Sequence, residues 1–207
     1  MTGSTAKYHA SAGETVAELF SVIARQGNSD YLGEQVSQLE HSLQAAILAQ
    51  NAGADSDTEL GALLHDVGRF IPAADKMPPM IALDGTFFGT ASHEVVGEKY
   101  LRHLGFSEKI CQLVAAHVMA KRYLTAVDKN YYDGLSQSSK TTLKFQGGPF
   151  TAQGIEAAQH DPWLDLKLAV RRWDDRAKDP DLRTPSLWSF QEMAVDSLAA
   201  SRTTAQT

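Results

Sequence analysis

The sequence predicts an all-α protein of one domain. Apolar residues recur at the spacing of an amphipathic helix in segment after segment, as in Val16, Leu19, Phe20 and Ile23, and no long alternating strand pattern interrupts them. The second observation is a series of Ser and Thr residues placed before these segments, where they can cap a helix. The length of 207 residues suits a single core.

Helix stop and start signals divide the first half of the chain. Gly27 and Gly53 end two amphipathic segments, and Ser56 with Glu59 resembles a capping box that starts a third. Residues 70–91 hold three of the seven prolines and keep no period, so we expect a long ordered loop there. The helices expected here are 14–25, 35–51 and 56–66, after a flexible tail over residues 1–13.

Capping residues define the second half as well. Ser92, Ser107, Ser136 and Thr151 stand before apolar segments, and Pro185 takes the favoured first position of the last helix. The expected helices are 93–104, 108–124, 136–145, a short one from Thr151, 163–177 and one from Thr184.

Composition narrows the functional class. The net charge of −6 gives no support to nucleic-acid binding, which usually needs a basic face. The one cysteine, Cys111, lies in an apolar pattern and is expected to be a core thiol. No stretch has the length of a transmembrane helix or the character of a signal peptide, so we expect a cytoplasmic protein without a membrane partner. The oligomeric state is not indicated.

Two potential metal ligands stand side by side at the end of the apolar run 60–64. His65 offers a neutral ring nitrogen and Asp66 an anionic oxygen, which suits iron, manganese or zinc. Alone, such a dipeptide is more often a buried pair with satisfied hydrogen bonds. The rest of the chain therefore decides between the two interpretations.

Further ligand types fall on other expected helices. His41, His65, His93 and His117 follow one another at intervals of 24, 28 and 24 residues, so they can meet at one level of an antiparallel bundle. With Asp66 and Asp174 they make four imidazoles and two carboxylates, which is too many for one metal with an open position. This favours two metals bridged by a carboxylate, with Asp66 as the expected bridge. The other histidines are expected in the tail (His9) or on the surface (His103 and His160).

These residues resemble a known family. His41, His65-Asp66 and Asp174 resemble the H…HD…D signature of HD-domain proteins, and His93 and His117 resemble its two-metal subset. Several blocks are similar to the mixed-valence di-iron phosphonate oxygenases, which are distant relatives of myo-inositol oxygenase. The blocks are YLGE (31–34), QLEHS (38–42), GFSE (105–108), HVMAKRYL (117–124), LKFQGGP (143–149) and RRWD (171–174).

The resemblance implies a cofactor of two iron ions, Fe(II)/Fe(III), with O2 as co-substrate. Such an enzyme oxidises C1 of a 1-hydroxyalkylphosphonate and cleaves its C–P bond, releasing phosphate and a carboxylate. From the match of these residues to the motif of the family, the ligands of one iron would be His41, His65, Asp66 and Asp174. Those of the other would be Asp66, His93 and His117.

The resemblance also implies the residues around the substrate. Tyr31 and Glu34 match a loop that closes over the site, where the Tyr can occupy the open iron position and the Glu faces the cationic nitrogen of the substrate. Lys121, Arg171 and Ser136 match the phosphonate contacts. Tyr31, Glu34 and Lys121 are therefore expected to take part in catalysis.

One position departs from the pattern of the aminophosphonate enzymes. They carry a second His in the motif HDxGH, where this chain has Arg69, which cannot act as a neutral acceptor or proton carrier. Arg69 is expected to contact the substrate. The chain is more similar to the branch that converts (R)-1-hydroxy-2-(trimethylammonio)ethylphosphonate to glycine betaine and phosphate.

Three alternatives stay open. The first is oxidation of the primary amine, (R)-2-amino-1-hydroxyethylphosphonate, to glycine and phosphate. The second is an HD-type phosphohydrolase, in which metals activate a water for attack on a phosphate ester. The third is a binding protein that keeps a metal for structure. The two additional histidines, His93 and His117, and the block Tyr31–Glu34 favour the oxygenase.

Overall fold

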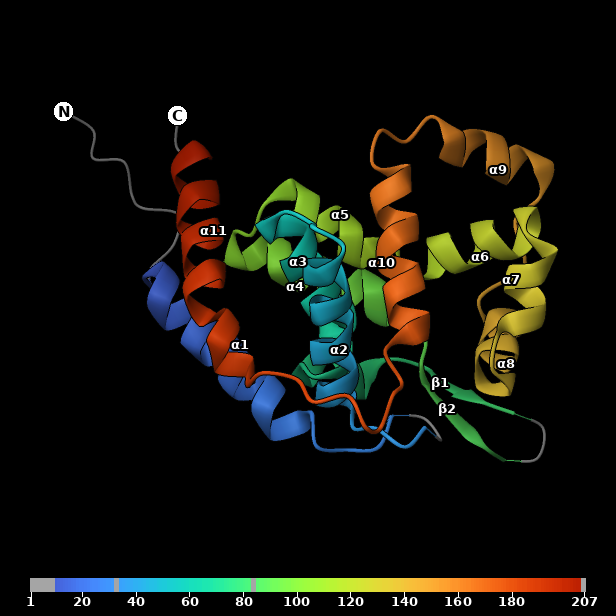
Figure 1. Ribbon diagram of the computed structural model, residues 1–207, viewed down its shortest axis with the longest axis horizontal. Coiled ribbons are helices and arrows are strands. Elements are labelled where there is room, and N and C mark those ends of the chain that lie inside the picture. The colour runs from blue at the N-terminus through green and yellow to red at the C-terminus, as the bar shows by residue number, and fades with distance from the viewer. Residues whose placement is uncertain (1–9, 32–33, 83–84, 206–207) are drawn as a thin grey trace.

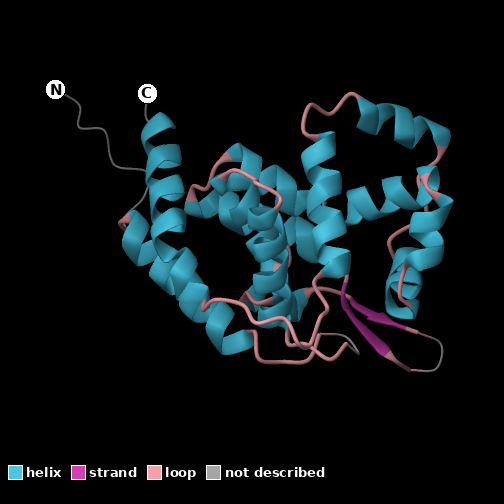
Figure 2. Cartoon of the chain, viewed as in Figure 1, coloured by secondary structure: helices cyan, strands magenta, loops and turns pink. Residues whose placement is uncertain are grey.

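The computed structural model describes residues 10–31, 34–82 and 85–205, and in these ranges the chain is a helical bundle with one small β-hairpin (Figures 1 and 2). The expected all-α class is confirmed. The helices of the described ranges are α1 (Ala12–Gln26), α2 (Gln38–Asn51), α3 (Ser56–Leu63), α4 (His93–Leu104), α5 (Glu108–Ala115), α6 (His117–Val127), α7 (Lys129–Gly134), α8 (Gln137–Phe145), α9 (Ala152–Gln159), α10 (Leu164–Arg176) and α11 (Gln191–Thr204). None of them is both long and apolar enough to cross a bilayer.

The helices form a central group with one layer on each side. Figure 1 shows α2 to α5 at the centre, α1 and α11 packed together on one side, and α6 to α9 on the other, with α10 between the centre and α6. The largest apolar cluster joins α1, the central helices and α11 through side chains that are fully buried: Leu19, Phe20, Leu60, Ile110 and Leu198. Each contributes roughly 1.5–3 kcal/mol by leaving water.

A second cluster positions α10. Ala45 and Ala49 of α2, Ala62 of α3 and Val170 of α10 are buried against one another. Because the alanines are small, α10 packs directly on α2 and α3. This contact brings the C-terminal half of α10 next to the start of α2.

Capping explains where the first helices begin. The side chain of Ser11 accepts from the backbone amide of Glu14 in a capping box, so α1 starts two residues earlier than expected. Ala12 and Gly13 of the expected tail therefore belong to this helix and Ser11 caps it, while residues 1–9 of that tail lie outside the described ranges. Ser37 and Glu40 form a second capping box, which starts α2 at Gln38 rather than at residue 35.

The third helix differs from the prediction at both ends. Its N-cap is Asp55, whose side chain accepts from the amide of Thr58, and not Ser56. It ends at Leu63, so His65 and Asp66 lie in the turn that leads into the 3-10 helix η1 (Val67–Arg69). A Cβ on Gly68 would lie 1.9 Å from the backbone oxygen of His93, so only glycine lets η1 meet the start of α4.

The expected loop 70–91 contains regular structure. A 3-10 helix, η2 (Pro72–Lys76), precedes an antiparallel hairpin of β1 (Pro79–Ile81) and β2 (Phe87–Thr90). The two strands were not predicted, because strands of three and four residues are too short to show an alternating pattern. Ser92 follows with φ 62° and starts α4 without a side-chain capping bond.

The expected helix 108–124 is divided in two. The chain turns at Ala116, which ends α5 and precedes α6, so His117 is the first residue of a new helix. α7 was not predicted, and Asp128 caps it. The last helix starts at Gln191 rather than near Pro185, after a 3-10 turn, η3 (Leu187–Phe190).

Candidate metal centre and adjoining pocket

The predicted metal ligands converge on one buried point in the bundle. They come from α2, the turn after α3, the first residues of α4 and α6, and α10. Each is at most 5% exposed: His41, His65, Asp66, His93, His117 and Asp174. Helices far apart in the sequence thus deliver imidazoles and carboxylates to one place, as the histidine spacing predicts.

Asp66 lies between two groups of histidines. Its Oδ1 is 3.1 Å from His93 Nε2 and 4.0 Å from His117 Nε2, while its Oδ2 is 3.8 Å from His65 Nε2. Two sets of potential ligand atoms, each within 4.8 Å of one another, share Asp66: His41, His65 and Asp66, and Asp66, His93 and His117. This arrangement suits a carboxylate that bridges two metal ions.

Asp174 closes the other side of the centre. Its Oδ1 lies 3.1 Å from His41 Nε2 and 3.7 Å from His65 Nε2. Its Oδ2 lies 3.2 Å from His117 Nδ1, and His65, His117 and Asp174 form a third set of close ligand atoms. The two predicted ligand groups are therefore packed against each other rather than separated.

Backbone carbonyls orient three of the imidazoles. The Nδ1 atoms of His41, His65 and His93 lie 2.8, 2.7 and 3.2 Å from carbonyl oxygens of Ala177, Ala62 and Thr90, respectively. Because a carbonyl only accepts, each Nδ1 carries the hydrogen, and each Nε2 presents a lone pair to the centre.

Two observations show that cations fit among these atoms. With that tautomer, His41 Nε2 and His65 Nε2 are two lone pairs only 3.1 Å apart, which repel each other unless a positive charge lies beside them. In addition, the four oxygens of Asp66 and Asp174 are buried and accept no hydrogen bond, although Arg69 and Arg171 each form an ion pair with one of these carboxylates. Buried polar atoms are normally satisfied, and metal ions would satisfy all of these.

The protonation states suit metal binding. Burial lowers the pKa of His117 well below its usual value and also lowers the pKa of His65. Burial alone would raise the pKa of Asp66, but the charge of Arg69, and that of His65 when it is protonated, outweigh burial and hold the pKa well below normal. Near neutral pH, these imidazoles are neutral and Asp66 is anionic, as metal ligands must be.

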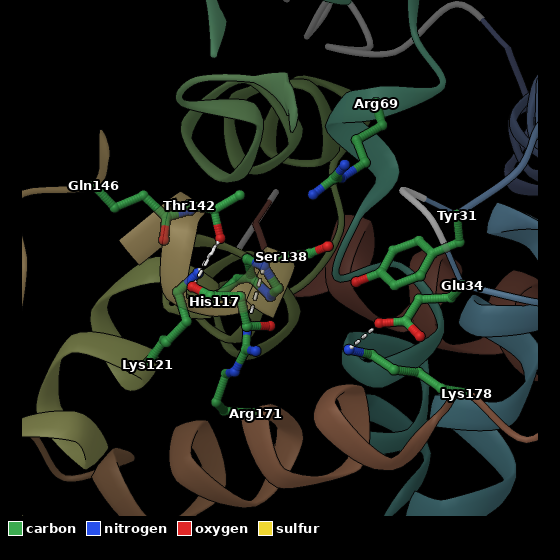
Figure 3. Close-up of a pocket in the computed structure, with 11 residues that line it drawn as sticks. Tyr31, Glu34, Arg69, His117, Lys121, Ser138, Thr142, Gln146, Arg171 and Lys178 are labelled. Atoms are coloured by element: carbon green, nitrogen blue, oxygen red, sulfur yellow. Dashed lines mark hydrogen bonds and ion pairs between the residues drawn. The ribbon is translucent and has the colours of Figure 1, made fainter. Parts of the chain in front are cut away.

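A small pocket adjoins the centre. His117 belongs to both, and Figure 3 shows the side chains that surround the pocket. The lining residues are Tyr31, Glu34, Arg69, His117, Lys121, Ser138, Ser139, Thr142, Gln146, Arg171 and Lys178. The structure thus brings five of the six predicted substrate-contacting residues to this pocket.

Ser136 is the exception. Its hydroxyl caps α8 by accepting from the amide of Ser139, and it does not line the pocket. A capping side chain turns back to the amides of its own helix, and for this reason the Ser136 hydroxyl does not point into the pocket. Ser138, Thr142 and Gln146 line the pocket instead, and their spacing of four residues places them on one helix face, which the sequence could have shown.

Two buried cations approach the pocket from α6 and α10. Lys121 is 2% exposed and its Nζ donates to Thr142 Oγ1 at 2.9 Å. Burial lowers the pKa of Lys121 to about 7, and no carboxylate of the described ranges lies within ion-pair distance of it. Arg171 is also buried, and its Nη1 lies 2.6 Å from Asp174 Oδ2. Lys121 is therefore a buried cation that lacks an anion.

Tyr131 and Asp175 hold the guanidinium of Arg171 on the side away from the ligand cluster. Its Nε lies 3.1 Å from Tyr131 Oη and 3.0 Å from Asp175 Oδ2, and its Nη2 is paired with Asp175 Oδ1. These contacts fix the plane of the guanidinium, so that Nη1 faces Asp174 and His117.

Tyr31, Arg69 and Glu34 lie on the other side of the pocket. The ring of Tyr31 stacks on that of His41, with centroids 3.8 Å apart. Arg69 points inward, and its Nε forms an ion pair with Asp66 Oδ2 at 3.0 Å. Glu34 is paired with Lys178 at 3.1 Å. Lys178 was not predicted, since it belongs to no motif and follows the end of α10.

The remaining histidines are distant from the centre. His103 and His160 are exposed, as expected, and His9 lies outside the described ranges. Cys111 is fully buried in the main apolar cluster, which agrees with its expected role as a core thiol.

Comparison with known proteins gives consistent relatives. The family model of the HD domain matches residues 39–142. A [1-hydroxy-2-(trimethylamino)ethyl]phosphonate dioxygenase (glycine-betaine-forming) of Leisingera caerulea is 36% identical over 87% of this chain and 89% of its own. A hydroxymethylphosphonate dioxygenase of Gimesia maris is 37% identical over 86% and 85%, respectively. Protein L432 of Acanthamoeba polyphaga mimivirus is 31% identical over 91% and 84%.

Proposed function

Since this chain belongs to the HD-domain family, and to the part of it that contains phosphonate dioxygenases, we propose that it is itself a hydroxyphosphonate dioxygenase. The reaction combines R–CH(OH)–PO3²⁻ with O2 to give R–COO⁻, hydrogen phosphate (HPO4²⁻) and a proton. C1 is oxidised, the C–P bond breaks and both oxygen atoms of O2 are reduced. One observation carries the proposal, namely that buried Lys121 and Arg171 line a pocket that shares His117 with the ligand cluster.

The proposed cofactor is a pair of iron ions, Fe(II)/Fe(III). His41, His65, Asp66 and Asp174 would hold one ion, and Asp66, His93 and His117 the other. Mixed nitrogen and oxygen donors suit iron, and an iron pair supplies the redox chemistry that couples O2 to oxidation of C1. The carbonyls behind His41, His65 and His93 keep these rings aimed at the centre throughout.

The side chains of the pocket would bind and orient the substrate. Lys121 and Arg171 supply positive charge and hydrogen-bond donors for a phosphonate dianion, and Thr142 supplies a hydroxyl. Arg69 adds a third cation beside Asp66. A substrate anchored through its phosphonate at this end would present its C1 hydroxyl to the centre. Tyr31, stacked on His41, would keep water from that side.

For the substrate we propose (R)-1-hydroxy-2-(trimethylammonio)ethylphosphonate. The resemblance of the chain to that branch supports it, and so does the name of one relative. The pocket offers a quaternary ammonium the carboxylate of Glu34 and the ring of Tyr31. The primary amine (R)-2-amino-1-hydroxyethylphosphonate is the alternative, and the name of a second relative adds hydroxymethylphosphonate, which has no cation.

The proposal is tested with iron-loaded protein and each of the three phosphonates in air. We expect O2 consumption and phosphate release in equal amounts, with glycine betaine formed from the trimethylated substrate. Phosphate release from a phosphate ester without O2 consumption would instead identify a hydrolase. If the protein binds no iron and turns over no substrate, the remaining hypothesis is a non-catalytic binding protein that keeps a metal for structure. Lys121→Met serves as a control, because it should lose phosphate release while it keeps the iron.

A further inference from the structure

The ion pair between Glu34 and Lys178 closes one end of the pocket. Glu34 is the only carboxylate among the described lining residues, and its Oε1 lies 3.1 Å from Lys178 Nζ. Both side chains are partly exposed, at 25% for Glu34 and 18% for Lys178. Lys178 stands two residues after the end of α10, beyond the ligand Asp174.

The charges of the pocket are separated between its two ends. Figure 3 shows Lys121 and Thr142 on one side and Tyr31, Glu34 and Lys178 on the other. The carboxylates of Asp66 and Asp174, in the ligand cluster, are paired with Arg69 and Arg171, so they are not available to a cationic ligand. A ligand with a phosphonate at the Lys121 end and a cation at its tail would have Glu34 as its only anionic partner.

Lys178 already makes the contacts that such a cation would use. Besides its pair with Glu34, its Nζ lies 5.8 Å from the centroid of the Tyr31 ring, within the range of a cation–π contact. A carboxylate and an aromatic ring are the groups that recognise a primary or quaternary ammonium. The side chain of Lys178 therefore occupies the place of a substrate cation.

We propose that Lys178 competes with the cationic nitrogen of the substrate for Glu34 and Tyr31, and so sets the preference between hydroxyphosphonates with and without a cationic tail. The inference rests on the proposed function. With an uncharged tail, Lys178 stays in place and neutralises Glu34, which would otherwise repel the phosphonate dianion. With a cationic tail, the substrate displaces Lys178, whose long, partly exposed side chain can turn into water.

The test compares two substrates in the variant Lys178→Met, which shortens the side chain by one atom and removes its charge. The kcat/KM should rise for the trimethylated substrate and fall for hydroxymethylphosphonate. A partly exposed ion pair contributes up to about 1 kcal/mol, which is about fivefold in each direction. Glu34→Gln should shift the ratio of the two values the opposite way, because it removes the partner of the cation.

Two controls accompany this variant. Lys109→Met removes a lysine of similar exposure that is paired with Asp55 at 2.6 Å far from the pocket, and it should leave the ratio unchanged. Lys178→Arg keeps the positive charge, so its ratio of kcat/KM values for the two substrates should stay near that of the parent protein. The measured ratio is the kcat/KM of the trimethylated substrate divided by that of hydroxymethylphosphonate. If Lys178→Met leaves this ratio unchanged or lowers it, with normal iron content, the inference is wrong.

A binding measurement separates this inference from the proposed function. Anaerobic calorimetry with the iron-loaded protein gives the Kd of both phosphonates without turnover. In Lys178→Met, the Kd of the trimethylated substrate divided by that of hydroxymethylphosphonate should fall by the same factor by which the kcat/KM ratio rises, because a lower Kd means tighter binding. If both ligands bind but neither is oxidised in air, the proposed function is wrong, and the Kd ratio still decides the role of Lys178.

Discussion

Removal of the Asp66 carboxylate should have two separable effects. Asp66→Ala takes one member from each of the two ligand groups, so we expect the variant to bind neither iron. It also leaves Arg69, whose side chain is only 10% exposed, without the carboxylate that now lies 3.0 Å from its Nε. Breaking one partner of a buried ion pair costs about 3–5 kcal/mol. For a chain of this size, that is a fall in Tm of roughly 6–20 °C.

A double variant distinguishes metal loss from unfolding. Asp66→Ala with Arg69→Met leaves no unpaired charge, so it should regain most of the lost stability of the metal-free protein. It should still bind no iron, because the shared ligand is absent. The surface ion pair of Lys109 and Asp55 gives a control, since Lys109→Met, which leaves the Asp55 cap of α3 in place, should lower the free energy of unfolding by less than about 1 kcal/mol.

The measurements are iron per chain after anaerobic loading with Fe(II), and thermal unfolding of the metal-free proteins. Two irons per chain in the double variant would refute the role of Asp66 in either site. One iron per chain would show that Asp66 serves a single ion and that the bridge is elsewhere. Equal Tm values for the single and double variants would refute the cost assigned to Arg69.

Three further predictions concern the surroundings of the centre. Because burial lowers the pKa of Lys121 to about 7, this lysine is cationic below that pH, so kcat/KM should fall as the pH rises through about 7, and Lys121→Arg should flatten that fall. Asp175→Asn loosens the guanidinium of Arg171, and KM should rise about tenfold with unchanged iron content, whereas an unchanged KM would contradict a positioning role. Gly68→Ala places a Cβ 1.9 Å from the backbone oxygen of His93, so the free energy of unfolding should fall by about 1–3 kcal/mol and iron should bind more weakly. Thermal unfolding and metal titration test this last prediction.

The ligand cluster could be predicted from the sequence because the spacing of the histidines does not depend on the exact helix boundaries. His41, His65, His93 and His117 recur at the length of a helix and its return, and a bundle brings such positions together even when a helix ends early. The end of α3 at Leu63 and the break at Ala116 differ from the predicted helix boundaries but leave these residues at the centre.

The surroundings of the pocket were harder to predict. The preference of Ser136 for its own helix amides, and the ion pair of Arg69 with Asp66, depend on local geometry that no period encodes. The hairpin consists of strands too short to show alternation. Lys178 reaches Glu34 only because α10 packs on α2, which is a tertiary contact between residues 144 apart in the chain.

The position of α10 late in the sequence also determines when, during synthesis, the candidate metal centre can be completed. Asp174 and the carbonyl of Ala177, which orients His41, are both supplied by the end of this helix, roughly 130 residues after His41 itself. At about 5–20 residues per second, a ribosome would make the last ligand on the order of ten to thirty seconds after the first. In that interval His41 and His65 are nascent-chain side chains without their final partner. The proposed metal ions are therefore expected to find their complete set of ligands only after α10 has been translated.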